Sequence, residues 1–254
     1  MNVSDIMDFK EIINKVDKDT LFLGHKNNIL LSIDINKYPS VIITGETGSG
    51  KSILLDQLIL QLIKTHTSLE MGIMSIDTAG VELNYYADSK YSLISASNDN
   101  DKSIVVLSRV LKEIERRKEL LHSNNVLTVR EYNEIAEEKL PLIVVAIDDD
   151  KFLLRNTDME KMLSGIINQL PGMGIMFIMA TSDVHNKFFE SDKNTLASVL
   201  VSFDYTNASE ALKANLNGAE DLQIGEFIAR LDNEERVYNN FEFDDHYIEE
   251  IVNR

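Results

Sequence analysis

The sequence contains no cysteine, few basic residues for its acidic content, and no long apolar segment. Without cysteine the chain has no disulfide and no thiolate metal site, and this composition fits a reducing cytoplasm. The longest apolar run, residues 140–147 (LPLIVVAI), is far too short to cross a bilayer. The first residues, MNVSDIMDFKEIINKV, lack the basic and then apolar pattern of a signal peptide. We therefore expect the isolated chain to be soluble.

The charge balance argues against a nucleic-acid partner. The 254 residues include 42 acidic and 25 basic side chains, and the net charge is -17. Binding to nucleic acid or to anionic lipid depends on clustered Lys and Arg side chains that displace counterions. The densest basic cluster is Arg116-Arg117-Lys118, which is interleaved with glutamate. Such a pattern is typical of a solvated helix face with ion pairs four residues apart, so we expect no nucleic-acid binding.

Hydrophobic patterning predicts the regular elements. Short runs that are apolar on both faces predict strands at residues 40–44, 71–77, 141–148 and 173–181. Longer periodic segments predict helices at residues 52–66, 102–123, 158–169 and 246–252. Two hairpins are expected, at residues 21–34 around a turn at 25–28, and at residues 225–241. Polar loops are expected at residues 97–101 and 186–195.

These elements indicate an α/β protein with a mainly parallel sheet. Strands that are apolar on both faces and alternate with helices are typical of a parallel sheet that helices cover on both sides. The hairpins lie near the two ends of the chain. We find no repeat, no low-complexity tract and no long linker, so residues 1–254 are expected to form one domain, with residues 1–20 as an N-terminal extension.

The stretch ITGETGSGKS, residues 43–52, is the strongest functional signal. Gly45, Gly50, Lys51 and Ser52 match the phosphate-binding pattern G-x-x-x-x-G-K-[ST]. The alternative is a chance match in a glycine-bearing turn, which the position between a predicted strand and a predicted helix disfavours. Backbone N–H groups along such a loop point at the phosphates, at the positive end of the following helix. The expected nucleotide-binding residues are Gly45, Glu46, Thr47, Gly48, Ser49, Gly50, Lys51 and Ser52.

A second signal is the acidic end of the predicted strand LIVVAIDDD. In phosphate-loop proteins Lys51 would bridge the β- and γ-phosphates, Ser52 would bind Mg²⁺, and an acid such as Asp148 would hold the metal's hydration shell. The alternative is a solvated acidic turn after a buried strand, and the glycine loop upstream makes the metal site the favoured interpretation. The five histidines show no metal-ligand spacing, and Tyr85, Tyr86 and Tyr91 are expected to pack rather than to stack on an adenine.

Ordered motifs from about Phe22 to the C-terminus resemble the FtsK/SpoIIIE-type motor ATPases. The resemblance rests on GETGSGKS, IDTAGVEL (76–83), EIERRKELLHSNNVLTVREYNE (113–134), LPLIVVAIDD, IMFIMATS and GAEDLQIGEF. It implies a RecA-like P-loop fold with ATP and Mg²⁺ as cofactors. The chain is most similar in kind to the EssC/EccC-type ATPases of type VII secretion, which carry tandem domains, and it resembles one such domain, a candidate for the last.

The resemblance also implies partners and a location. We expect small helical secreted proteins and sister ATPase domains as partners, at the cytoplasmic face of the membrane as part of a larger membrane protein. The isolated domain is expected to be a monomer. Two other functions stay open: a DNA-translocating ATPase, which would need basic loops, and a degenerate regulatory domain with a vestigial nucleotide site.

Three departures from the family pattern indicate that hydrolysis is weak or absent. Asp149 stands where active members carry a glutamate that polarises the attacking water, and Thr181, at the sensor position, is followed by Ser182 rather than glutamine. A base that is one methylene shorter is displaced by ~1 Å, which can lower the rate by ~10²-fold. The chain also has no arginine between Arg155 and Arg230. An arginine finger commonly contributes roughly 10³–10⁵ in rate.

Overall fold

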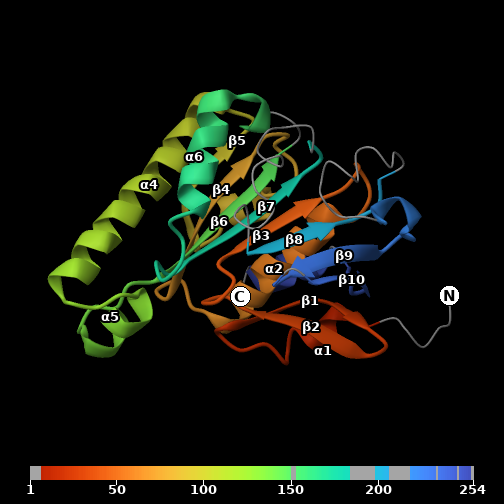
Figure 1. Cartoon of the computed structure of the whole chain (residues 1–254), viewed down its shortest axis with the longest axis horizontal. Coiled ribbons are helices and arrows are strands. Elements are labelled where there is room, and N and C mark those ends of the chain that lie inside the picture. The colour runs from red at the N-terminus through yellow and green to blue at the C-terminus, as the bar shows by residue number, and fades with distance from the viewer. Residues whose placement is uncertain are drawn as a thin grey trace.

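The computed structural model describes residues 7–149, 153–183, 198–205, 218–232, 234–244 and 246–252. Its strands form one ten-stranded sheet in the order β2-β1-β10-β9-β8-β3-β7-β6-β4-β5 (Figure 1). The strands are β1 Thr20–Lys26, β2 Ile29–Asp34, β3 Ser40–Thr44, β4 Met71–Asp77, β5 Ser92–Ser97, β6 Leu142–Asp149, β7 Ile175–Thr181, β8 Val199–Ser202, β9 Glu226–Leu231 and β10 Glu234–Asn239. The helices are α1 Phe9–Ile12, α2 Lys51–Thr65, α3 Asn84–Ala87, α4 Asn100–Ser123, α5 Val129–Ile135, α6 Thr157–Ile167 and α9 His246–Val252, with 3₁₀ turns η2 Leu153–Arg155 and η3 Ala219–Asp221.

The centre of the sheet is parallel and one side is antiparallel. Strands β8, β3, β7, β6, β4 and β5 pair in parallel, whereas β9, β10, β1 and β2 continue the sheet by antiparallel pairing. The two terminal hairpins, which are far apart in the sequence, therefore lie side by side in one sheet. This arrangement confirms the predicted α/β fold with a mainly parallel sheet and terminal hairpins.

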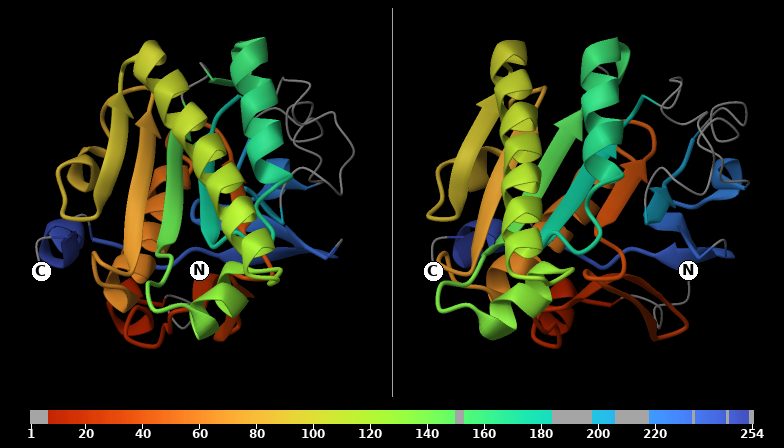
Figure 2. Two further views of the ribbon diagram at one scale, coloured as in Figure 1. Left: turned by 90° about the vertical axis from the view of Figure 1, so that its left-hand side faces the viewer. Right: turned by 60° about the vertical axis from the view of Figure 1, so that its left-hand side comes forward.

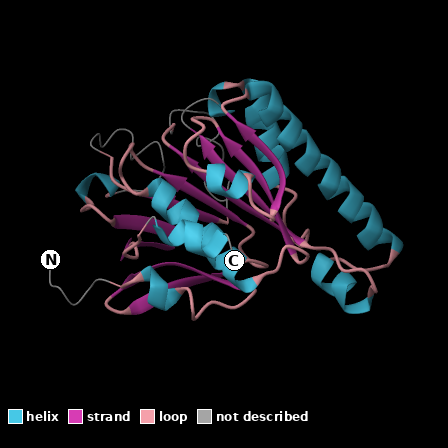
Figure 3. Ribbon diagram, turned by 180° about the vertical axis from the view of Figure 1, so that it is seen from behind, coloured by secondary structure: helices cyan, strands magenta, loops and turns pink. Residues whose placement is uncertain are grey.

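Helices cover both faces of the sheet, as predicted. Along β6, Val144 and Ala146 belong to one apolar cluster, whereas Val145 and Ile147 belong to the other, because successive side chains of a strand point to opposite faces. Helices α4 and α6 run along one face (Figure 2), and α2 lies on the opposite face with α3 and α9 (Figure 3). Within the described ranges, no helix combines the length and the apolar character needed to cross a bilayer.

Several elements differ from the expectation in detail. Strand β5 was missed because it is mixed in polarity, and β8 because it has four residues. The first hairpin turns at Asn27 and Asn28, which have φ of 51° and 61°, so His25 belongs to β1 rather than to the turn. The expected loop at residues 186–195 lies outside the described residues.

Arg117 ties helix α4 to the beginnings of two central strands. Its side chain is fully buried; Nη1 donates to the carbonyl oxygens of Met173 and Gly174 at 2.7 and 2.9 Å, and Nη2 donates to that of Pro141 at 2.7 Å. Nε donates to Glu113 at 2.7 Å. The expectation of a solvated face is therefore wrong for Arg117, because the planar guanidinium satisfies carbonyl groups that precede β6 and β7.

We predict that Arg117→Lys lowers the free energy of unfolding by about 2–4 kcal/mol, because one ammonium group cannot reach all the buried acceptors that the guanidinium bonds. Arg116, whose side chain is half exposed and pairs with Glu113, provides the matched control. Arg116→Lys should change the free energy by no more than about 0.5 kcal/mol. Urea denaturation of the two variants measures both values, and equal effects would contradict the anchoring role.

Candidate functional site

The glycine loop is wound tightly between β3 and α2. Gly48 and Gly50 have φ of 83° and 112°, values that a side chain disfavours, and Gly50 caps the N-terminus of α2. A β-carbon on Gly45 would lie 2.5 Å from Ser49 Oγ and 2.8 Å from Phe203 Cβ. These positions therefore require glycine, and the loop ends at a helix N-terminus, where free N–H groups favour anions.

The chain that follows β8 supports the base of this loop. Phe203 N–H donates to the Thr44 carbonyl at 2.9 Å, and Glu46 N–H donates to the Asp204 carbonyl at 3.1 Å. The Phe203 ring lies against Phe227, with 5.4 Å between the ring centroids. Sequence reasoning missed this support because β8 was not predicted.

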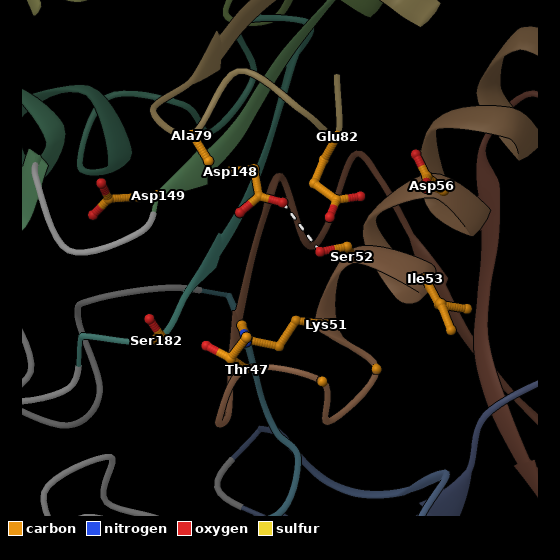
Figure 4. A pocket seen from close by; sticks show the side chains of 12 residues that line it. Thr47, Lys51, Ser52, Ile53, Asp56, Ala79, Glu82, Asp148, Asp149 and Ser182 are labelled. Atoms are coloured by element: carbon orange, nitrogen blue, oxygen red, sulfur yellow. Dashed lines mark hydrogen bonds between the residues drawn. The ribbon is translucent and has the colours of Figure 1, made fainter. Parts of the chain in front are cut away.

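A pocket of about 390 Å³ opens beside the loop (Figure 4). Its volume lies within the range of small-molecule sites. Its lining combines the loop with the ends of neighbouring strands: Thr47, Gly48, Gly50, Lys51, Ser52, Ile53, Asp56, Ala79, Glu82, Asp148, Asp149 and Ser182. The Lys51 ammonium donates to the Glu46 carbonyl at 2.8 Å, so it lies within the curve of the loop.

Ser52 and Asp148 meet in this pocket. The Ser52 hydroxyl donates to Asp148 Oδ2 at 3.2 Å (Figure 4). Burial, followed by the charge of Glu82, raises the pKa of Asp148 from 3.8 to about 7; Asp77 adds to the shift, while Ser52 and Lys51 oppose it. A nearby cation stabilises the charged form of a carboxyl group whose pKa is raised in this way.

Glu82 is a pocket residue that the sequence analysis includes only as part of the motif IDTAGVEL, without a role in the site. It follows β4, the strand next to β6, and its carboxylate lies beside Asp148 and Ser52 (Figure 4). The signal that could have found it is an acid in the loop after a strand that neighbours the acidic strand. The expected residues Gly45, Glu46 and Ser49 form the loop itself rather than the pocket wall.

Asp149 and Thr181 are both buried at the ends of neighbouring strands, and of the two only Asp149 lines the pocket. Asp149 is buried, and its Oδ1 accepts the Leu153 N–H at 2.9 Å; Figure 4 shows its side chain turned away from Asp148. Thr181 is fully buried, and its Oγ1 accepts the Asp183 N–H at 3.1 Å. Asp149 and Thr181 are paired across β6 and β7, and Ser182 brings that strand end to the pocket.

The donor set fits Mg²⁺ held jointly with a phosphate. Among the described residues, no group of three or more His, Asp or Glu side chains is arranged to hold a metal. Mg²⁺ in nucleotide sites is usually bound by one or two protein oxygens together with phosphate oxygens and water. A hydroxyl and a carboxylate beside a glycine loop match that requirement.

Comparison with known proteins agrees with this geometry. The model of the FtsK/SpoIIIE family matches residues 3–190. The DNA translocase FtsK of Clostridium tetani is 31% identical over 189 residues, which are 70% of this chain and 25% of that protein. The FtsK of Campylobacter jejuni is 32% identical over 154 residues, 58% of this chain and 16% of that protein. The matched segment thus spans no more than a quarter of these two relatives.

Solved structures share the fold. The conjugation coupling protein TcpA of pCW3, solved with ATPγS, has a TM-score of 0.84 at 20% identity and covers 100% of this chain and 75% of its own. EssC ATPases 2 and 3 from Geobacillus thermodenitrificans have a TM-score of 0.78 at 20% identity, covering 92% of this chain and 48% of theirs. The EccC cytoplasmic domain of Thermomonospora curvata has a TM-score of 0.75 at 19% identity, covering 93% and 31%.

We predict that Asp148→Asn stabilises the metal-free protein at neutral pH. A folded-state pKa raised above the unfolded value means that the folded protein binds the extra proton, so wild-type stability falls as pH rises from about 4 to about 7. The variant lacks this loss and should be more stable by about 2–4 kcal/mol above pH 7. Denaturant unfolding in EDTA at several pH values measures the difference.

The neighbouring acid is the matched control for that measurement. Asp149→Ala removes the acceptor of the Leu153 N–H and should lower stability by about 1–2 kcal/mol. If Asp148→Asn lowers stability throughout this pH range, the carboxyl group is not strained as described.

Proposed function

Because the chain belongs to the FtsK/SpoIIIE family, we propose that it is an MgATP-binding, motor-type domain that hydrolyses ATP weakly or not at all by itself. The observation that carries this proposal is the meeting of Lys51, Ser52 and Asp148 in one pocket at the glycine loop. The loop of residues 45–52 holds the phosphates through its N–H groups, and Lys51 neutralises the β- and γ-phosphates. Ser52 and Asp148 would hold Mg²⁺, which would supply positive charge to the phosphates.

Weak hydrolysis follows from the catalytic side chains that this nucleotide site lacks. Asp149 and Thr181 occupy the family's catalytic positions, yet Asp149 is short and its Oδ1 is engaged by Leu153 N–H. Ser182 replaces a side-chain amide, and residues 156–229 contain no arginine. These groups act mainly in the transition state, so their loss reduces turnover while ATP binding is kept.

We infer that the macromolecule handled by the complete protein is a protein, as in type VII secretion. The net charge of -17 disfavours a nucleic-acid partner, and EssC and EccC domains share the fold. One EccC structure, of ATPases 2 and 3, contains a signal sequence peptide. By this proposal the domain works beside sister ATPase domains at the cytoplasmic face of the membrane and recruits or exports small helical proteins. The membrane attachment belongs to the rest of a larger chain, and the isolated domain is a monomer.

DNA translocation is the second candidate. The curated relatives reported above are DNA translocases, and TcpA is a conjugation coupling protein. A third function, a regulatory domain with a vestigial nucleotide site, predicts no ATP binding at all.

ATP binding is tested by thermal unfolding. We predict that millimolar MgATP raises the Tm, since a ligand that binds only the folded state stabilises it, and that the rise needs Mg²⁺. Lys51→Ala should abolish the rise while leaving the unliganded Tm nearly unchanged. Ser49→Ala, in the same loop but outside the pocket wall, is the matched control and should keep most of the rise. A wild-type protein without any shift would establish the vestigial site instead.

The partner class is tested with duplex DNA. We predict negligible binding of a labelled duplex by the isolated domain at physiological salt, because an acidic surface repels phosphodiesters. The measurement is fluorescence anisotropy over a series of salt concentrations. Micromolar binding that weakens steeply with salt would favour DNA translocation over protein export.

A further inference from the structure

The pocket wall includes four acidic side chains, which are Asp56, Glu82, Asp148 and Asp149. Asp149 Oδ1 accepts the buried Leu153 N–H, and Asp56, one turn along α2 from Ser52, accepts the Tyr86 hydroxyl at 2.7 Å. Asp148 and Glu82 lie beside each other and beside Ser52 (Figure 4). The second carboxylate near the Ser52 hydroxyl thus comes from the loop after β4 and not from the end of β6.

We propose that Glu82 is the second carboxylate of the metal site, where, beside Asp148, it would accept hydrogen bonds from water bound to Mg²⁺. The proposal rests on the MgATP-binding function proposed above. It assigns Glu82 a positioning role, because its carboxylate acts through water on the metal.

The loop that carries Glu82 is fixed at both of its ends. Asp77, at the tip of β4, accepts the N–H groups of Gly80 at 2.7 Å and Leu83 at 2.9 Å, which closes residues 77–83 into a compact turn. Gly80 has a φ of 74°, a left-handed value that lets the turn close. Both oxygens of the buried Asp77 carboxylate accept these hydrogen bonds, so Asp77 stabilises the conformation of the loop.

The same loop is attached directly to the residue it faces. Thr78 N–H donates to the carbonyl oxygen of Asp148 at 3.0 Å, and Asp77, the residue before Thr78, is paired with Asp148 across the neighbouring parallel strands β4 and β6. A backbone hydrogen bond therefore joins Glu82's loop to Asp148. Glu82 is half-buried, which limits the positions that its carboxylate can take.

This placement suits the chemistry of Mg²⁺ better than direct binding would. Mg²⁺ keeps several of its waters in nucleotide sites, and those waters donate hydrogen bonds to carboxylates around them. Outer-shell partners of this kind typically contribute 10–100-fold to metal affinity. A glutamate with a long side chain reaches such a water from a neighbouring strand's loop, whereas Asp149 is turned away.

The test is a Mg²⁺ titration of nucleotide binding, followed by the fluorescence of an ATP analogue at a fixed concentration. We expect Glu82→Gln to raise the Mg²⁺ concentration needed for half-maximal binding by about tenfold. Binding of the analogue in EDTA should stay equal or become tighter, since a negative charge near the phosphates is removed. Glu115→Gln, on the exposed face of α4, removes the same charge far from the pocket and should behave as wild type.

Each outcome separates the two proposals. If wild type binds the analogue with Mg²⁺ and Glu82→Gln titrates like Glu115→Gln, the role of Glu82 is excluded while the MgATP-binding function stands. If wild type does not bind the analogue under any condition, the proposed function fails and the role of Glu82 fails with it. Glu82→Asp keeps the charge but shortens the side chain, so an increased Mg²⁺ requirement in that variant supports a positioned carboxylate over a general charge effect.

Discussion

The structure depends on one constraint: parallel strands that end at the same edge of a sheet place their final side chains together. Strands β3, β7, β6 and β4 are neighbours, and their registers align Thr44 with Thr181, Thr181 with Asp149, and Asp77 with Asp148. The glycine loop leaves β3 at this edge, so Lys51 and Ser52 enter the same space. The order of the strands thus brings loop residues that are far apart in the sequence into one pocket.

Bringing carboxyl groups to this edge has an energetic consequence. Burial and the neighbouring charge of Glu82 raise the pKa of Asp148, so this carboxyl group resists ionisation at neutral pH. By the proposed function, a divalent cation and the Lys51 ammonium would favour the charged form of Asp148 when a triphosphate binds. The arrangement sacrifices some stability of the unliganded fold for binding, a common property of functional sites. Arg117 acts at the opposite ends of the strands, where it holds the segments that begin β6 and β7.

Sequence patterns predicted what is local and missed what depends on tertiary contacts. The loop motif and the acid at the end of an apolar strand are local, so Lys51, Ser52 and Asp148 were found together. The side-chain direction of Asp149 depends on a hydrogen bond with Leu153, and the nearness of Glu82 depends on the order of the strands; neither is readable from spacing. Arg117 resembles its exposed neighbour Arg116 in sequence and differs only because strand beginnings pack against it. Strand β8 has four residues, which is too few for a periodic pattern, so the sequence predicts neither this strand nor the support that Phe203, the next residue, gives to the loop.

The central claim is that this domain holds ATP but does not cleave it at a useful rate. The most direct measurement is steady-state phosphate release by the purified domain in saturating MgATP, compared with the Lys51→Ala variant under the same conditions. The account predicts that the two rates are indistinguishable, although wild type binds the nucleotide. Turnover of several per second that Lys51→Ala abolishes would contradict it, and would mean that Asp149 or an arginine outside residues 156–229 completes the catalytic site.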